Sequence, residues 1–107
     1  MAGALDGIRV IDLTAMITGP LATMILADQG AEVIKIEPPG VGDVMRYLGT
    51  HRGGMSAFYA SCNRSKRSIV VNLREDGGRD LVRDLAASAD VFIQNFRPGV
   101  IDRLGLG

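Results

Sequence analysis

The sequence has little cysteine, no excess of charge and no long hydrophobic run, and each absence excludes a class of protein. The single cysteine, Cys62, excludes an intrachain disulfide and a metal site built from several thiolates. Twelve Lys and Arg residues balance 12 Asp and Glu residues, whereas a protein that coats nucleic acid needs a positive excess. No apolar run reaches the roughly 18 residues of a membrane span, and no secretory signal pattern is visible. We therefore expect a cytoplasmic protein that binds neither nucleic acid nor a membrane.

What is present is a chain of 107 residues with the composition of one globular domain, 47% hydrophobic and 22% charged. Short apolar runs rich in β-branched residues predict strands at 8–13, 32–36, 68–72 and 91–94. Helical patterns follow at 21–28, 56–63, 75–89 and 100–104, with Pro20 in the first turn of one helix and Gly30 as its C-terminal cap. This alternation predicts an α/β fold, a Rossmann-like open parallel sheet of about four strands with helices on both faces.

The expected ligand site lies at the edge of this sheet. In doubly wound sheets, ligands bind beyond the carboxyl ends of the strands, at the point where the strand order reverses. If the strand order is 3-2-1-4, the flanking loops are 14–19 and 95–99, and Arg74 follows the third strand at the same edge. The loops with the most unusual residues therefore converge on one place.

The phosphate-binding patterns of common nucleotide sites are missing. A dinucleotide site needs G-x-G-x-x-G after the first strand, and only Gly19 occurs in that loop. Glu37 ends the second strand, where a ribose-binding acid would sit, but an acid without the glycines is weak support, so we expect neither NAD nor FAD. No G-K-[ST] occurs, and His51 has no second histidine or carboxylate at metal-ligand spacing, so we expect no metal.

Two interpretations stay open for six basic residues that lie near strand boundaries in the second half of the chain. Such side chains could bind a ligand with several phosphates, or form a solvated rim paired with Asp76, Asp80, Asp84 and Asp102. The set comprises Arg64, Lys66, Arg67, Arg74, Arg97 and Arg103. Asp12 is expected to cap local structure and Cys62 to be a small buried residue. No Ser-His-Asp, Cys-His or paired-carboxylate constellation can be assembled.

Four ordered blocks of sequence resemble the class III CoA-transferase family, which includes formyl-CoA transferase, carnitine-linked CoA-transferases and α-methylacyl-CoA racemase. They are LDGIRVIDLT followed by Gly19-Pro20, then LADQGAEVIKIEPPG at 26–40, NRSKRSI at 63–69, and ADV with NFRPGV and LGLG from 89 onward. The resemblance extends from about residue 5 to the end of the chain.

The resemblance implies that coenzyme A or an acyl-CoA is bound as substrate at the edge selected above. The matching positions are Ile17, Thr18, Val71, Asn72, Leu73, Arg74, Asn95, Phe96, Arg97 and Arg103. Two positions depart from the family. Pro38 stands where several relatives have an arginine that contacts the nucleotide. Ile17 stands where formyl-CoA transferase has a glutamine, so formyl-CoA:oxalate specificity is less expected.

The resemblance also implies where the chemistry lies. In the transferases an aspartate attacks the acyl-CoA thioester, and in the racemases acid–base groups move the α-proton; both sets would lie beyond Gly107. Residues 1–107 would thus be the N-terminal part of the CoA-binding large domain, inactive alone, of an enzyme that takes acyl-CoA and carboxylic acid substrates as an interlocked homodimer. A racemase is the alternative within the family. A non-catalytic nucleotide-binding or interaction module is the alternative outside it.

Overall fold

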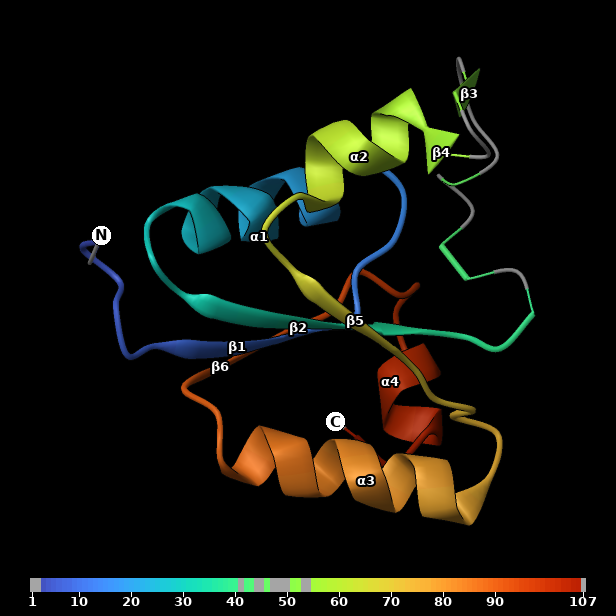
Figure 1. Cartoon of the computed structure of the whole chain (residues 1–107). Coiled ribbons are helices and arrows are strands. Elements are labelled where there is room, and N and C mark those ends of the chain that lie inside the picture. Colours follow the sequence, from blue (N-terminus) through green and yellow to red (C-terminus); the bar gives the residue numbers. More distant parts are fainter. Residues whose placement is uncertain (1–2, 41, 44–45, 47–50, 53–54, 107) are drawn as a thin grey trace.

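The computed structural model describes residues 3–40, 42–43, 46, 51–52 and 55–106. Its strands and helices alternate along the chain (Figure 1). In order they are β1 (Arg9–Asp12), α1 (Thr18–Asp28), β2 (Glu32–Glu37), β3 (His51–Arg52), β4 (Met55–Ser56), α2 (Ala57–Asn63), β5 (Arg67–Val70), α3 (Asp76–Ala87), β6 (Val91–Ile93) and α4 (Val100–Arg103).

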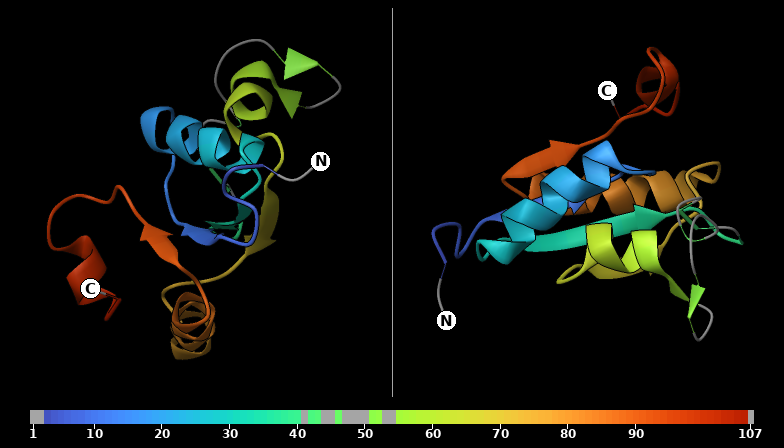
Figure 2. Two further views of the ribbon diagram at one scale, coloured as in Figure 1. Left: turned by 90° about the vertical axis from the view of Figure 1, so that its left-hand side faces the viewer. Right: turned by 90° about the horizontal axis from the view of Figure 1, so that it is seen from above.

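Four strands form one parallel sheet in the order β5-β2-β1-β6. This is the order 3-2-1-4 that was assumed in placing the ligand site, and the predicted strands and helices are confirmed with ends shifted by a few residues. Figures 1 and 2 show α1 and α2 on one face of the sheet and α3 and α4 on the other. The α/β, Rossmann-like prediction with helices on both faces is therefore confirmed. The sequence predicted no strand for the short antiparallel pair β3-β4, whose last residue, Ser56, is the first of the predicted helix 56–63.

Two glycines shape the connection around α1. The chain leaves the helix at Gly30, whose φ of +104° lies in the left-handed region that favours glycine, and this confirms the predicted cap. At the other end, Gly19 lies against Thr14, since a Cβ built on Gly19 would be 2.5 Å from the Cβ of Thr14. The first turn of α1 therefore packs directly on the loop that follows β1.

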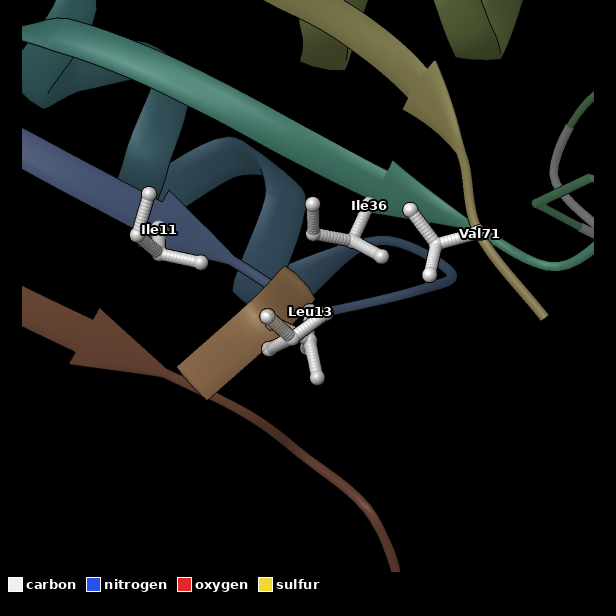
Figure 3. Packing of buried hydrophobic residues seen from close by; sticks show 5 residues of the cluster. Ile11, Leu13, Ile36 and Val71 are labelled. Carbon is white, nitrogen blue, oxygen red and sulfur yellow. The ribbon is translucent and has the colours of Figure 1, made fainter. Parts of the chain in front are cut away.

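The face under α3 and α4 is apolar from the middle of the strands to their carboxyl ends, whereas Arg9 and Glu32 form an ion pair near the amino ends. Side chains alternate across a strand, so Ile11 and Leu13 of the β1 segment and Ile36 of β2 point to this face. They pack with Val71 and with Val82 of α3 (Figure 3). This is the larger hydrophobic core, which fixes α3 on the sheet.

The opposite face, under α1 and α2, is apolar near the amino ends of the strands and polar near their carboxyl ends. Near the amino ends Val10 and Val33 form a smaller core with Ala31. Toward the carboxyl ends the same alternation places Asp12, Lys35 and Glu37 on this face, all at most 2% exposed. A fully buried polar layer therefore underlies α1 and α2 beside the edge where the ligand site was expected.

Candidate functional site

A cavity of about 660 Å³ opens at the carboxyl edge of the sheet, within the size range of small-molecule sites. Its apolar wall includes Leu13, Ile36 and Val71 from the core under α3. The loop after β2 and the helix α4 complete the wall with Pro38 and Leu104, among others. The cavity therefore lies where a doubly wound sheet binds its ligand.

The structure brings half of the predicted site residues to this cavity. Those in its wall are Val71, Asn72, Leu73, Arg74 and Phe96. The other five lie on neighbouring loops or helix ends and are not among the residues that line it: Ile17, Thr18, Asn95, Arg97 and Arg103.

The sequence-based set missed the loop after β2, which contributes Pro38, Pro39, Gly42 and Asp43 to the wall. The signal for it was available. The carboxyl ends of all parallel strands meet at one edge, so the break at Pro38-Pro39 had to lie beside the loops after the other strands. Val100 at the start of α4 and Leu104 directly after its last residue were missed as well.

A turn after β5 presents Arg74 to the cavity. The side-chain Oδ1 of Asn72 accepts a hydrogen bond from the Arg74 amide at 3.0 Å, and the backbone carbonyl of Asn72 accepts one from the Glu75 amide at 3.2 Å. Asn72 is a residue type that favours such turns because its side chain replaces a backbone acceptor. Arg74 is exposed and forms no ion pair within the described part of the chain.

The six basic residues separate into two groups. Arg64 pairs with Asp28 at 2.8 Å, Lys66 with Asp12 at 3.0 Å and Arg67 with Glu32 at 3.9 Å. Like Arg74, Arg97 and Arg103 form no ion pair among the described residues.

The aspartates that the solvated-rim interpretation gave as partners do not pair with any of the six basic residues in the described part of the chain. Asp76 and Asp80 bind Arg79 and Arg83 of their own helix α3 instead. Of the six, Arg74, Arg97 and Arg103 therefore have no acidic partner among the described residues, and Arg103 Nε donates to the Gly99 carbonyl at 3.3 Å.

Glu37 is held by protein groups on all sides. Its carboxylate accepts hydrogen bonds from the Asp43 amide at 2.8 Å, from Arg46 at 2.7 and 2.8 Å, from Tyr59 at 3.3 Å and from Ser68. Burial alone raises the pKa of Glu37, but these hydrogen bonds and the Arg46 charge outweigh it and lower the pKa from 4.5 to about 2. With five protein donors bound, the Glu37 carboxylate has no acceptor position left for a further hydroxyl.

Asp12 is similarly occupied. It accepts hydrogen bonds from the Thr14 amide and hydroxyl, from the Thr23 hydroxyl at 2.7 Å and from Lys66. Burial raises its pKa, but these donors hold the pKa below its ordinary value. Burial also lowers the pKa of Lys66, an effect that the Asp12 charge partly offsets. Asp12 therefore anchors local structure, as expected, and is not a free acid. Cys62 is buried beside Tyr59, also as expected.

The sequence model of CoA-transferase family III matches residues 5–107. The chain belongs to CoA-transferase family III. It is 50% identical over 103 residues to acetyl-CoA:oxalate CoA-transferase of Acetobacter aceti, covering 96% of this chain and 26% of that protein. It is 47% identical over 104 residues to human succinyl-CoA:glutarate CoA-transferase, covering 96% of this chain and 24% of that protein.

A solved structure of this family has the same fold. The CAIB/BAIF family protein from Brucella suis superposes with a TM-score of 0.92 at 42% identity, over 100% of this chain and 29% of that one. The chain thus spans about a quarter of the length of the family III relatives it matches. No helix among the described residues is long and apolar enough to cross a membrane. Nor do three His, Cys, Asp or Glu side chains gather there closely enough to hold a metal ion.

Proposed function

We propose that this chain is the CoA-binding N-terminal portion of an acyl-CoA:carboxylate CoA-transferase. The observation that carries the proposal is the cavity at the carboxyl edge of the sheet, with Arg74 in its wall. It lies in a chain of a family whose named relatives are CoA-transferases. Those names favour a transferase over the racemase alternative, and also over a non-catalytic nucleotide-binding or interaction module.

The chemistry of the cavity suits coenzyme A, which combines a flat aromatic base and a pantetheine chain with charged phosphates. Leu13, Ile36 and Phe96 offer apolar surface to an adenine or pantetheine group. The Arg74 guanidinium can bind a phosphate through two parallel hydrogen bonds. Arg97 and Arg103 stand on the adjoining loop and helix and would reach phosphates that extend from the cavity.

The reaction itself is proposed for the longer protein. A carboxylate oxygen of an aspartate outside residues 1–107 attacks the thioester carbon, and the CoA thiolate leaves to give a mixed anhydride. The thiolate then attacks the aspartyl carbonyl and releases the donor acid, which leaves an enzyme-bound CoA thioester. The acceptor carboxylate reverses these steps to take CoA away. In this division of labour, residues 1–107 bind CoA as the first part of the large domain, without the nucleophile.

Calorimetry with CoA and with NAD tests the proposal. CoA should bind more tightly than NAD, and Arg74→Ala or Arg103→Ala should each weaken CoA binding by about 1–3 kcal/mol, the value of a hydrogen bond to a charged group. Arg64→Ala is the matched control, because Arg64 is paired with Asp28 and is not in the cavity wall. Equal affinity for CoA and NAD, or equal losses in all three variants, would contradict the proposal. The homodimer and the cytoplasmic location stay predictions from the sequence.

A further inference from the structure

The loop that follows β1 is held by side chains instead of by neighbouring backbone. The Leu13 amide donates a hydrogen bond to the Ile93 carbonyl at 2.8 Å. After Leu13, the backbone N–H and C=O of Thr14 and Ala15 and the N–H of Met16 all bind side chains. The Thr14 amide donates to Asp12 at 2.8 Å and the Thr14 carbonyl accepts from Lys35 at 3.2 Å. The contacts of Ala15 and Met16, described next, complete the series.

The backbone N–H and C=O of Ala15 both bind the side chain of Asn95, which lies in the loop after β6. Its amide donates to Oδ1 of Asn95 at 3.1 Å, and its carbonyl accepts from Nδ2 of Asn95 at 2.9 Å. A side-chain amide has one acceptor and one donor group, so it can bind the backbone N–H and C=O of one residue at the same time. The two hydrogen bonds together fix the orientation of the Ala15 backbone. The loop after β6 is thereby fastened to the loop after β1, across 80 positions of sequence.

Met16 shows that this loop needs holding. Its φ is +74°, in the left-handed region, which is unfavourable for a side chain of this kind. Its side chain is 42% exposed, so packing into a core does not enforce the conformation. Polar contacts do: the Met16 amide donates to Oδ1 of Asp43 at 3.0 Å, and Oδ2 of Asp43 pairs with Lys35 at 2.8 Å.

The side chains that bind this loop differ in how deeply they are buried. Asp12, Lys35 and Asp43 are all buried beneath the loop and belong to the polar layer under α1 and α2. Asn95 lies on the exposed side. Replacing a buried side chain would disturb the whole layer, whereas replacing Asn95 removes its two hydrogen bonds with Ala15 and leaves the buried side chains in place.

Thr14 and Ala15 line the cavity, and so does Asp43. We propose that Asn95 is a positioning residue: its side-chain amide clamps Ala15 and holds the loop 14–16 as one wall of the cavity, so that it acts on the ligand through this loop. The inference rests on the proposed CoA-binding function for its ligand. It assigns Asn95 a role different from the direct contact that the family resemblance implied.

The test compares the parent protein with Asn95→Ala by amide hydrogen exchange and by CoA affinity. Exchange at the Ala15 and Met16 amides should accelerate at least about tenfold, and CoA affinity should fall about tenfold, as expected for the loss of two ordinary hydrogen bonds. Gln94→Ala is the matched control. It removes the neighbouring amide side chain, which binds the Phe96 amide and not this loop, and should leave both exchange rates unchanged.

Two outcomes overturn the proposal. Unchanged exchange at Ala15 and Met16 would show that Asn95 does not hold the loop. Faster exchange with unchanged CoA affinity would show that the held loop does not matter for the ligand. Failure of the parent protein to bind CoA would instead contradict the proposed function, and the exchange measurement would still decide whether Asn95 holds the loop. Arg74→Ala separates the two roles, since it should weaken CoA binding without changing exchange at Ala15.

Discussion

Replacing Glu37 by glutamine should destabilise the protein by an amount that depends on pH. The Glu37 carboxylate binds Arg46, Ser68, Tyr59 and the Asp43 amide, and its pKa falls from 4.5 to about 2 as a result. Because each pKa unit corresponds to about 1.4 kcal/mol, the ionised carboxylate contributes about 3 kcal/mol to folding at neutral pH. Glutamine keeps the shape of the side chain but cannot supply the charge.

The sign of the pH dependence follows from the lowered pKa. The folded protein holds the ionised form more tightly than the unfolded chain does, so the stabilisation is complete above pH 4.5 and is lost as the pH falls through 2. The free energy of unfolding of the parent should therefore exceed that of Glu37→Gln by about 3 kcal/mol at pH 7. The difference should shrink by about 2 kcal/mol between pH 7 and pH 3.

Urea denaturation of both proteins at several pH values between 7 and 3 measures this difference, and other titrating groups largely cancel in the comparison. Glu75→Gln serves as the control. It removes an exposed carboxylate that forms no ion pair among the described residues, and should change stability by less than about 1 kcal/mol. A difference between the parent and Glu37→Gln that stays constant down to pH 3 would refute the reasoning, because a structural loss without a charge contribution has no such pH dependence.

Two further substitutions test the packing by thermal or urea unfolding. Val82→Ala should cost about 2 kcal/mol, since Val82 is fully buried in the larger core, whereas Leu81→Ala at the exposed neighbouring position should cost much less; equal losses would contradict the described core. Gly19→Ala should cost about 1–3 kcal/mol because its Cβ would overlap Thr14. Gly77→Ala, with no atom within 4 Å of its Cβ, should instead raise stability slightly through helix propensity; a neutral Gly19→Ala would show that the helix and loop do not pack closely.

The fold could be predicted because it depends on local patterns. The apolar runs and the helical periods alternate, and the right-handed crossover rule then leaves few arrangements for four parallel strands. What the sequence did not reveal is the polar layer. The run EVIKI reads as a buried strand, yet Lys35 within it is fully buried and paired with Asp43, a residue outside any strand.

The candidate site was predictable in location and less so in detail. The strand order selects the edge, and five of the ten predicted residues line the cavity there. The role of Asn95 could not be derived, because a ligand contact and a clamp require the same residue type at the same place. The contact with Ala15, far away in sequence, distinguishes them only when both loops are placed in space.

The alternation of side chains on β1 and β2 has a consequence for how the sheet finds its pairing. If either strand slipped by one residue, its side chains would exchange faces. Asp12, or Lys35 with Glu37, would then face the apolar core that contains Ile11, Leu13 and Val82, away from the partners Lys66, Asp43 and Arg46 that they have in the native sheet. Burying a charge without its partner costs several kcal/mol per ion. The polar layer thus discriminates against misregistered sheets, and the correct pairing is specified by what the wrong one would bury.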